Sequence, residues 1–573
     1  MSAPTVADYV MDRLADLGIG HVFGVPGDYA FPIDNAIESN RRLSWVLCSN
    51  ELNAAYSADG YARMKGAAIL TTTYNVGEAS ALCGVLGARA ERLPVFHVVG
   101  APSTRLARTR RPMHHSFGDG ALEPFRAVSA VSVCASAFLT PQNAIAEMER
   151  VIGEALSQRQ PAYIQIPEDY AMMPVVGEPI RGVPLEHAPT FASNPRELEA
   201  AVSAILARLA DAKAPVILAA YTIARYGLRR NLEAFLEASG IPFAVSSMEK
   251  GLISESNPLF AGVYSGDYPP ESAGVRTLVE GADLVLNLGG MRLSDFAAGY
   301  GDSIQATRML TVWPDHVELG AQGDAGGQGP ATFGPVHFKD ALMELAKRTP
   351  KFDRPFQRPP AKPPFGAPGE RVTNASIYSR IQQFLEREDI LFVAPGTCAA
   401  TGALPTVLLP DGADFHSQIL WACVGWAAPA AFGAALAAPS RRVILVDGDG
   451  GHQFSASQIG TMGQYGVNPI ILVLNNGLFG VEEVLQGNSN PEDIHVYDKI
   501  PAWKYHLLPE AMGCRDWFCA CVATNEELDS ALVTARKRPG AAYIEIVLTG
   551  TPMPPAMPAA SIDRLYQVAT PKG

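Results

Sequence analysis

The feature that most restricts the fold of this chain is a repeated alternation of short apolar runs with helical patterns. Runs rich in Val, Ile and Leu are followed, again and again, by stretches in which apolar residues recur at helical spacing. This order is typical of parallel sheets, because parallel neighbours need a long crossover connection, which is usually a helix. The sequence therefore predicts an α/β fold of doubly wound parallel sheets.

Two proline-rich stretches, at 175–195 and 350–369, divide this alternation into three blocks of similar size. Such composition favours extended linkers. We therefore predict three domains, at residues 1–180, 196–348 and 371–573. The expected strands are 21–25, 45–48, 69–72 and 95–99 in the first block, 216–220, 243–246, 284–288 and 309–312 in the second, and 390–393, 443–446, 470–474 and 542–547 in the third.

Composition and charge exclude several classes of function. Hydrophobic residues make up 48% of the chain and charged residues 18%, which favours a globular protein with large cores. The net charge of −13 disfavours nucleic acid or an anionic membrane as a partner, because both need a basic face. No signal-peptide pattern or membrane-length apolar run is visible, and the eight scattered cysteines lack a metal-binding spacing. We expect a cytoplasmic protein with reduced thiols.

The most informative segment is a glycine-rich turn in the third block. The strand at 443–446 leads into residues 447–451, Asp-Gly-Asp-Gly-Gly, and the next strand ends in Asn475-Asn476. In one right-handed βαβ unit, Asp449 and Asn476 emerge at the carboxyl ends of neighbouring strands, where open α/β sheets bind ligands. The helix N-terminus favours a phosphate, and carboxylate and amide oxygens suit Mg²⁺. Taken alone, the turn fits a plain strand–turn–helix connection better.

The 24 residues between Gly450 and Asn475, with strands on both sides, resemble the signature of thiamine-diphosphate enzymes. The resemblance covers nearly the whole chain, in the order pyrimidine-binding, central and diphosphate-binding domain. It is strongest to the pyruvate and indolepyruvate decarboxylase branch. The motifs that carry it are Val-Pro-Gly-Asp at 25–28, Asn-Glu-Leu-Asn-Ala-Ala at 50–55, adjacent histidines at 114–115 and Val-Glu at 481–482.

This resemblance implies both a cofactor and a metal site. Asp449, Asn476 and the backbone carbonyl of Leu478 would hold Mg²⁺. The other positions implied to contact thiamine diphosphate are Glu51, Thr397, Ala422, Val424, Gly448, Gly450 and Gly451.

The resemblance also implies the catalytic residues. Glu51 would hydrogen-bond the aminopyrimidine ring and promote its imino form, a task suited to a carboxyl whose pKa is raised by burial. Glu482 would lie beside the departing carboxylate, while Asp28, His114 and His115 would relay protons to a thiamine-diphosphate enamine. Considered singly, Glu51 would be a favourable first-turn residue of a helix, and the others a turn Asp, a surface Glu and ordinary histidines.

The implied reaction is the non-oxidative decarboxylation of a 2-oxo acid to an aldehyde and CO2. Where relatives that handle pyruvate carry bulky aromatic side chains, this chain has small residues, which predicts an aromatic or branched 2-oxo acid. Side chains around 565–566 would fill that space in the opposing interpretation. The expected pocket residues are Phe296, Ala399, Ala400, Val481 and Leu485.

Three alternatives stay open: pyruvate as the substrate, a carboligase or synthase of the same superfamily, and a cofactor-binding protein without turnover. The resemblance further implies a homodimer or homotetramer, with each active site between two subunits.

The chain departs from the family pattern at several positions. Ala394 stands where an acidic residue is usual, Asn75 where glycine is usual and Cys83 where asparagine is common, and the family's Gly-Tyr pair is displaced to Leu478-Phe479. Arginines at 105, 108, 110 and 111 precede the histidines. They favour either a solvated loop or the steering of anionic substrates.

Overall fold

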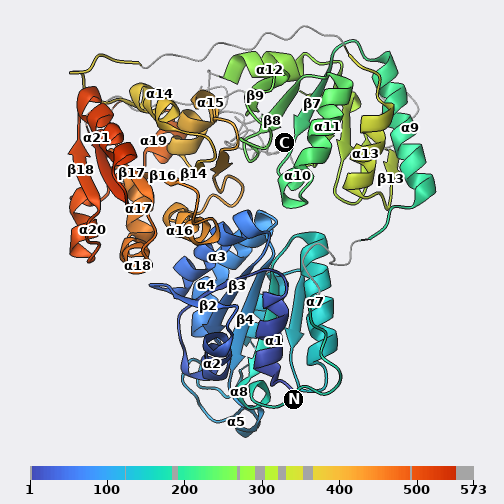
Figure 1. The fold of residues 1–573 in the computed structure, drawn as a ribbon, viewed down its shortest axis with the longest axis vertical. Helices are drawn as coiled ribbons and strands as arrows, with labels where there is room; N and C mark the ends of the chain where they lie inside the picture. The colour runs from blue at the N-terminus through green and yellow to red at the C-terminus, as the bar shows by residue number, and fades with distance from the viewer. Residues whose placement is uncertain are drawn as a thin grey trace, which may run out of the picture.

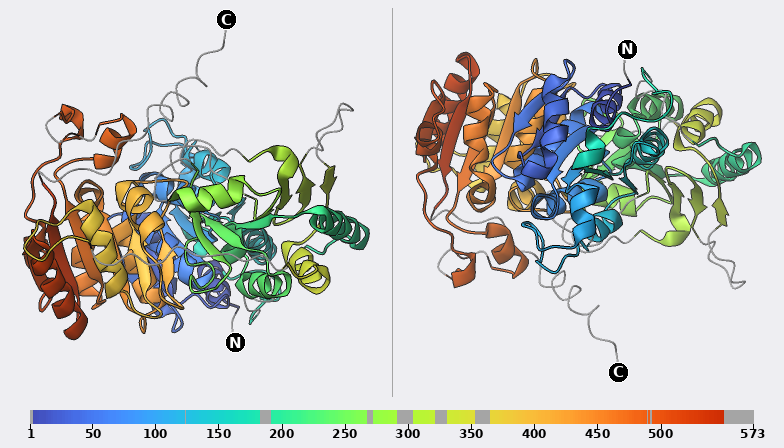
Figure 2. Two further views of the ribbon diagram at one scale, coloured as in Figure 1. Left: turned by 90° about the horizontal axis from the view of Figure 1, so that it is seen from above. Right: turned by 90° about the horizontal axis from the view of Figure 1, so that it is seen from below.

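The computed structural model describes residues 3–549 apart from 123, 183–190, 267–271, 291–303, 321–330, 353–364, 489 and 491–492. Its strands form three sheets of six, seven and six strands. In Figure 1 the first unit lies below the other two, with the middle unit on the right and the third on the left. Figure 2 shows the same arrangement from above and below. The predicted α/β fold with three mainly parallel sheets is confirmed.

The first sheet is parallel throughout, in the order β2-β1-β3-β4-β6-β5. Strands β3, β4 and β6 are buried along their whole length, as expected for strands covered on both faces. The order in which strands are added to the sheet reverses between β1 and β3. In open α/β sheets, such a switch point has a crevice at the carboxyl ends of the two strands. The strands are β1 (His21–Gly24), β2 (Ser44–Leu47), β3 (Ala68–Thr73), β4 (Val95–Ala101), β5 (Ala135–Phe138) and β6 (Ala162–Pro167).

The middle sheet has the order β13-β12-β11-β10-β7-β8-β9. Its last two strands in sequence pair antiparallel, because the connection between β11 and β12 is too short for a crossover helix. The strands are β7 (Pro215–Ala219), β8 (Phe243–Ser246), β9 (Phe260–Tyr264), β10 (Leu284–Leu288), β11 (Met309–Val312), β12 (Val317–Leu319) and β13 (Ala331–Phe333).

The third sheet is again parallel, in the order β15-β14-β16-β17-β19-β18. The order in which its strands are added reverses between β14 and β16. The strands are β14 (Ile390–Val393), β15 (Asp414–His416), β16 (Val443–Gly448), β17 (Ile470–Asn475), β18 (Phe518–Val522) and β19 (Ala542–Val547).

Helices connect the strands of each unit. The first unit has α1 (Val6–Ala15), α2 (Phe31–Ser39), α3 (Glu51–Lys65), α4 (Val76–Ala90), α5 (Thr104–Thr109), α6 (Pro124–Val131), α7 (Ala144–Gln158) and α8 (Glu168–Ala171). The middle unit has α9 (Pro195–Asp211), α10 (Thr222–Arg225), α11 (Arg229–Ser239), α12 (Ala273–Glu280) and α13 (Phe338–Arg348). The third has α14 (Asn374–Phe384), α15 (Leu404–Thr406), α16 (Ala427–Ala437), α17 (Asp449–Ser455), α18 (Gln458–Gln464), α19 (Gly480–Leu485), α20 (Leu508–Ala511) and α21 (Asn525–Lys537).

Helices α3 and α16 join the first unit to the third (Figure 1). A Cβ atom on Gly60 would lie 1.9 Å from the carbonyl oxygen of Ala430, so this close approach requires glycine. Trp426 Nε1 donates to Asp59 Oδ1 at 3.0 Å across the same contact. The two units are therefore packed backbone against backbone.

Every strand expected from the sequence is present, with ends that shift by one or two residues. The sequence did not predict β5, β6, β9, β12, β13, β15 or β18, most of which are short or lie at sheet edges. The two linkers fall partly outside the described residues, and the predicted domain boundaries stay a prediction. Among the described helices, none is long and apolar enough to cross a membrane.

Candidate active site

A cavity lies at the carboxyl ends of β14, β16 and β17, where the strand order of the third sheet reverses. Open α/β sheets bind ligands at this place. Every described residue that lines the cavity belongs to the third unit, between residues 374 and 548. The predicted positions among them are Thr397, Val424, Gly448, Asp449, Gly450, Gly451, Asn476, Leu478 and Val481.

The glycine-rich turn carries the chain from β16 directly into α17, which begins at Asp449. A Cβ atom on Gly450 would lie 2.6 Å from the ring of Phe479, so glycine lets the two loops of the cavity approach each other. The predicted βαβ unit is therefore present, although its helical part is divided into α17 and α18.

Asp449 is a buried carboxylate, 1% exposed, at the edge of this cavity. It accepts from the backbone N–H of Gly450 at 2.9 Å and from that of Gly477 at 2.6 Å. Burial raises the pKa of Asp449 to about 7, against the opposing effect of these backbone donors. Among the described residues no Lys, Arg or His forms an ion pair with it, so a bound cation would supply the missing charge.

Asn476 extends the same set of oxygen atoms. Its side-chain oxygen accepts from the N–H of Leu478 at 3.2 Å, and Leu478 also lines the cavity. A carboxylate, an amide oxygen and a backbone carbonyl are hard ligands of the kind that Mg²⁺ prefers. The residues present therefore fit a magnesium ion beside a diphosphate.

A buried chain of polar side chains lies behind the turn, and the sequence interpretation missed it. Asp447 Oδ2 lies 3.0 Å from His452 Nδ1, and His452 Nε2 lies 2.7 Å from the Tyr543 hydroxyl. The other oxygen of Asp447 is buried without a partner. These contacts fix the base of the turn. An Asp at the end of an otherwise apolar strand was the one available signal.

A second group of predicted residues gathers at the carboxyl edge of the first sheet. Asp28 follows β1, and its Oδ2 lies 2.7 Å from His114 Nε2. His115 Nε2 lies 3.8 Å from Asp28 Oδ1, and the two imidazole rings are 4.4 Å apart. The structure therefore brings the three residues together, with His114 rather than His115 in direct contact with the carboxylate. A carboxylate beside two imidazoles can pass a proton from one side chain to the next, because imidazole gains and loses a proton readily.

Three residues that sequence reasoning did not assign hold this histidine pair in place. The Tyr74 hydroxyl donates to the carbonyl of His114 at 2.6 Å, and Asn75 Nδ2 donates to that of His115 at 2.7 Å. Tyr29 stacks on the His114 ring, with centroids 5.0 Å apart. Asn75 has a φ of 54°, a conformation that asparagine tolerates better than most residues. Asn75 therefore fits at a position where the family usually has glycine, and its side chain adds a hydrogen bond.

Glu51 is the first residue of α3 and is half-buried at the same edge. The cap of this helix is Asn50, whose side chain accepts from the N–H of Asn53 at 2.7 Å. The carboxylate of Glu51 points towards the start of α4, since its Oε1 would lie 3.6 Å from a Cβ atom on Gly77. The helix is capped without Glu51, so capping does not account for the glutamate.

Glu482 lies on α19, and its side chain is exposed. The neighbouring Glu483 is fully buried and accepts from the backbone N–H of His495 at 2.7 Å. This contact ties the loop after α19 back onto the helix. Val481 is half-buried against Gly396, since a Cβ atom there would lie 3.5 Å from Val481 Cβ. The position of Val481 agrees with a pocket residue, and Leu485 is half-buried on the same helix.

The remaining predicted positions differ in what the structure says of them. Ala422 is half-buried with a φ of 51°, and Val424 is 42% exposed. Ala399 is fully buried in an apolar core and does not line the cavity around Asp449. The side chain of Ala400, Phe296 and residues 565–566 lie outside the described residues. The arginines at 105, 108, 110 and 111 are exposed, on or just after α5.

Comparison with known proteins matches each unit to a thiamine pyrophosphate enzyme model. The N-terminal TPP binding domain matches residues 4–122, the central domain 202–329 and the C-terminal TPP binding domain 400–546. A solved structure, the thiamine diphosphate-dependent 4-hydroxybenzoylformate decarboxylase of Rhodococcus jostii RHA1, superimposes with a TM-score of 0.76 over 95% of this chain and 99% of that one. At 19% identity, this likeness supports the fold alone.

Two relatives carry the comparison further. The alpha-keto-acid decarboxylase of Mycolicibacterium paratuberculosis is 36% identical over 559 residues, 96% of this chain and 95% of that protein. That of Mycobacterium tuberculosis is 35% identical over the same shares. The chain belongs to the family of thiamine-diphosphate-dependent 2-oxo acid decarboxylases.

Proposed function

We propose that the protein decarboxylates a 2-oxo acid to an aldehyde and CO2 with thiamine diphosphate and Mg²⁺, in the cytoplasm. The observation that carries the proposal is the pairing of two sites in one chain. An oxygen-lined cavity surrounds buried Asp449, and a proton-relay cluster surrounds Asp28. The eight cysteines are all free thiols, as is usual in a reducing compartment.

Each group of residues has a distinct task. When bound, thiamine diphosphate supplies a nucleophilic carbon and an electron sink. Asp449, Asn476 and the Leu478 carbonyl would hold Mg²⁺, which would neutralise the diphosphate, and the nearby N-terminus of α17 would favour that negative charge.

The acid–base residues manage protons. Glu51 holds a proton at the aminopyrimidine ring, and Asp28 with the two histidines delivers one to the reacting carbon. Glu482 would act beside the departing substrate carboxylate. The aldehyde results from protonation, which this set provides, whereas a carboligase would need a second carbonyl substrate at that position.

We infer that the working form is a homodimer, or a tetramer of such dimers. Among the described residues of the first unit, none lines the cavity around Asp449, although Glu51 has to reach the same cofactor. Apolar side chains are exposed beside both half-sites, namely Val424 at 42%, Phe454 at 64% and Val76 at 48%. A second copy that placed its first unit over this cavity would complete the site and cover these side chains.

Mixing two inactive variants tests the shared site. Glu51→Gln and Asp449→Ala chains each lack one half of the constellation. If sites are shared, a heterodimer contains one site with both groups intact. Random exchange of subunits makes about half of the dimers heterodimers, and one of the two sites in each heterodimer is intact. About a quarter of wild-type activity should therefore return. Activity that stays at the level of the separate variants would contradict a shared site.

We further propose an aromatic or branched 2-oxo acid as the substrate. The support is the aliphatic Val481, which lines the cavity beside Gly396, where a Trp-sized side chain would reduce the room for a ring. Burying a phenyl ring gains roughly 2–3 kcal/mol, or about 30- to 150-fold in preference.

Val481→Trp should remove that room. We expect the wild type to favour phenylpyruvate over pyruvate in kcat/KM, and the variant to lower the ratio at least about tenfold. Val533→Trp, at an exposed position on α21, is the matched control and should leave the ratio unchanged. A wild type that prefers pyruvate, or a ratio that Val481→Trp does not move, would count against the proposal.

A further inference from the structure

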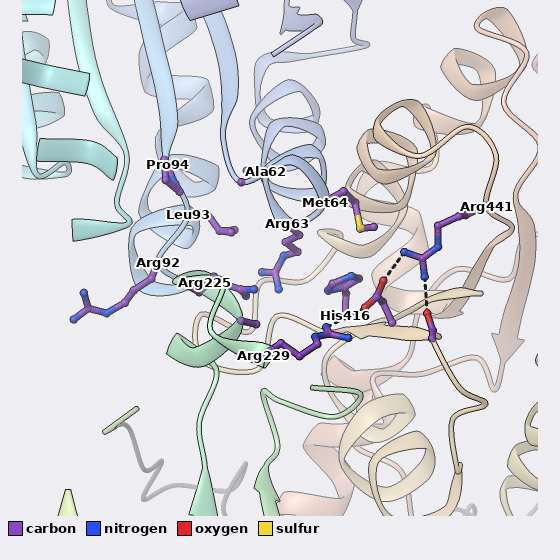
Figure 3. Close-up of a pocket in the computed structure, with 15 residues that line it drawn as sticks. Ala62, Arg63, Met64, Arg92, Leu93, Pro94, Arg225, Arg229, His416 and Arg441 are labelled. Atoms are coloured by element: carbon purple, nitrogen blue, oxygen red, sulfur yellow. Dashed lines mark hydrogen bonds and ion pairs between the residues drawn. The ribbon is translucent and has the colours of Figure 1, made fainter. Parts of the chain in front are cut away.

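A separate cavity of about 460 Å³ lies where the three units meet (Figure 3). Its walls come from the C-terminal end of α3 and the turn before β4, from α10 and the start of α11, and from β15 and the turn before β16. It shares no lining residue with the cavity around Asp449. The decarboxylation proposed above does not use it.

Arginine dominates the lining of this junction cavity. Five of the described lining residues are arginines, at 63, 92, 225, 229 and 441, whereas Asp414 is the only carboxylate among the lining residues that the structure describes. Figure 3 shows Arg63, Arg225, Arg229 and His416 close together, from the three units, whereas the side chain of Arg92 points away from them. Like charges held this close repel one another unless anions lie between them.

Two of these arginines are already neutralised. Arg63 Nε pairs with Asp59 at 2.7 Å, and its NH2 pairs with Glu91 at 3.2 Å. Arg441 NH1 pairs with Asp414 at 2.6 Å, and its other nitrogens donate to backbone carbonyls. These two guanidinium groups therefore need no further anion.

The other three share the same carboxylates or have none. Arg229 NH2 lies 3.3 Å from Asp414, which Arg441 already contacts. Arg225 NH2 lies 3.7 Å from Glu91, the partner of Arg63. Arg92 donates to the carbonyl of Gln158 at 3.2 Å.

The charges of this junction do not balance. Five guanidinium groups face three carboxylates, Asp59, Glu91 and Asp414, which leaves five minus three, or two, positive charges in excess. Glu249 also interacts with Arg225, and counting Glu249 as charged still leaves five minus four, or one, positive charge in excess. An anion in the cavity would complete the balance.

His416 adds an unpaired polar atom to the same wall. Its Nε2 is buried and has no hydrogen-bond partner in the described part of the chain, although such atoms are rare in folded proteins. Burial and the nearby arginines lower the pKa of His416 to about 3, against the opposing effect of Asp414, so the ring is neutral. A neutral imidazole can still donate one N–H to a bound anion.

We propose that the junction cavity binds a compact anion with two or more negative charges, of the phosphate or dicarboxylate type, through Arg225, Arg229 and His416. The guanidinium fork matches the oxygens of either group. The volume lies within the range of small-molecule sites. Because the three residues come from the middle and third units, the anion would also hold these units together.

Calorimetry on the holoenzyme tests the proposal, with thiamine diphosphate and Mg²⁺ saturating so that the diphosphate site is filled. The probes are inorganic phosphate and succinate, with acetate as the singly charged control at equal ionic strength. We expect at least one dianion to bind about tenfold more tightly than acetate or better. Phosphate alone identifies a phosphate site, succinate alone a dicarboxylate site, and both a general dianion site. Dianions that bind no better than acetate would overturn the proposal.

Two variants locate the binding. Arg229, whose side chain is 41% exposed, can be replaced with little loss of packing. Arg229→Ala should weaken dianion binding at least about tenfold. Arg230→Ala, at the neighbouring exposed position outside the cavity, should not change it. Equal binding by the two variants would place the anion elsewhere and refute the site.

A measurement on the wild type covers the case in which Arg229→Ala does not fold. The side-chain NMR signal of His416, assigned by its loss in His416→Gln, should shift on addition of the tighter-binding dianion and not on addition of acetate. An unmoved His416 signal at saturating dianion would equally contradict the proposal.

Discussion

Replacing Glu51 with Gln is expected to lower kcat by about 10²- to 10⁴-fold while cofactor affinity stays within a few-fold of wild type. The amide preserves the shape of the side chain and can still hydrogen-bond, but it cannot exchange a proton with the aminopyrimidine ring. Glu51 is half-buried at the carboxyl edge of the first sheet, and its Oε1 is directed towards the start of α4. The measurements are steady-state decarboxylation and calorimetric binding of thiamine diphosphate.

The structure supplies a matched control for this prediction. Asn50 caps α3, so Asn50→Ala should cost about 1 kcal/mol of stability and leave kcat nearly unchanged. If Glu51→Gln retained more than about half of its activity, or if both variants lost activity to the same degree, Glu51 would have a structural role only.

Replacing Asp449 with Ala is expected to weaken cofactor binding at least tenfold, about 1.4 kcal/mol or more. The variant removes the one charged ligand expected for Mg²⁺. Without the metal, no cation neutralises the diphosphate. The apo protein should not be destabilised, because the carboxylate is buried and its pKa is raised to about 7 by that burial.

Thermal unfolding separates these effects. Wild type should gain stability on addition of thiamine diphosphate and Mg²⁺, and Asp449→Ala should not. Asp493→Ala, an exposed carboxylate beyond α19, is the control and should respond like wild type. A full cofactor-induced rise in Tm for Asp449→Ala would rule out its role at the metal.

Much of the fold follows from the sequence because local pattern and burial agree. Strands β14, β16 and β17 are continuous apolar runs, and such runs are buried on both faces of a parallel sheet. Strands β12 and β13 were missed because each is three residues long and they lie at the edge of the sheet or next to it, where the apolar pattern is weak.

The candidate site could be predicted where chemistry depends on residues near one another in sequence. The Gly-Asp-Gly turn and the His114-His115 pair are of this kind. The residues that hold these motifs in place could not be predicted in this way. Tyr543 contacts His452, and Asn75 contacts His115, only after the strands are aligned. The junction cavity is the extreme case, since its arginines come from four separate segments of the chain and form no motif.

The central claim is tested most directly by CO2 release from a panel of 2-oxo acids, with protein stripped of cofactor and then reconstituted. We expect CO2 and an equal amount of aldehyde only when thiamine diphosphate and Mg²⁺ are both added, with an aromatic or branched acid as the best substrate. Absence of CO2 from every acid in the reconstituted protein, or a carbon–carbon condensation product in place of free aldehyde, would contradict it.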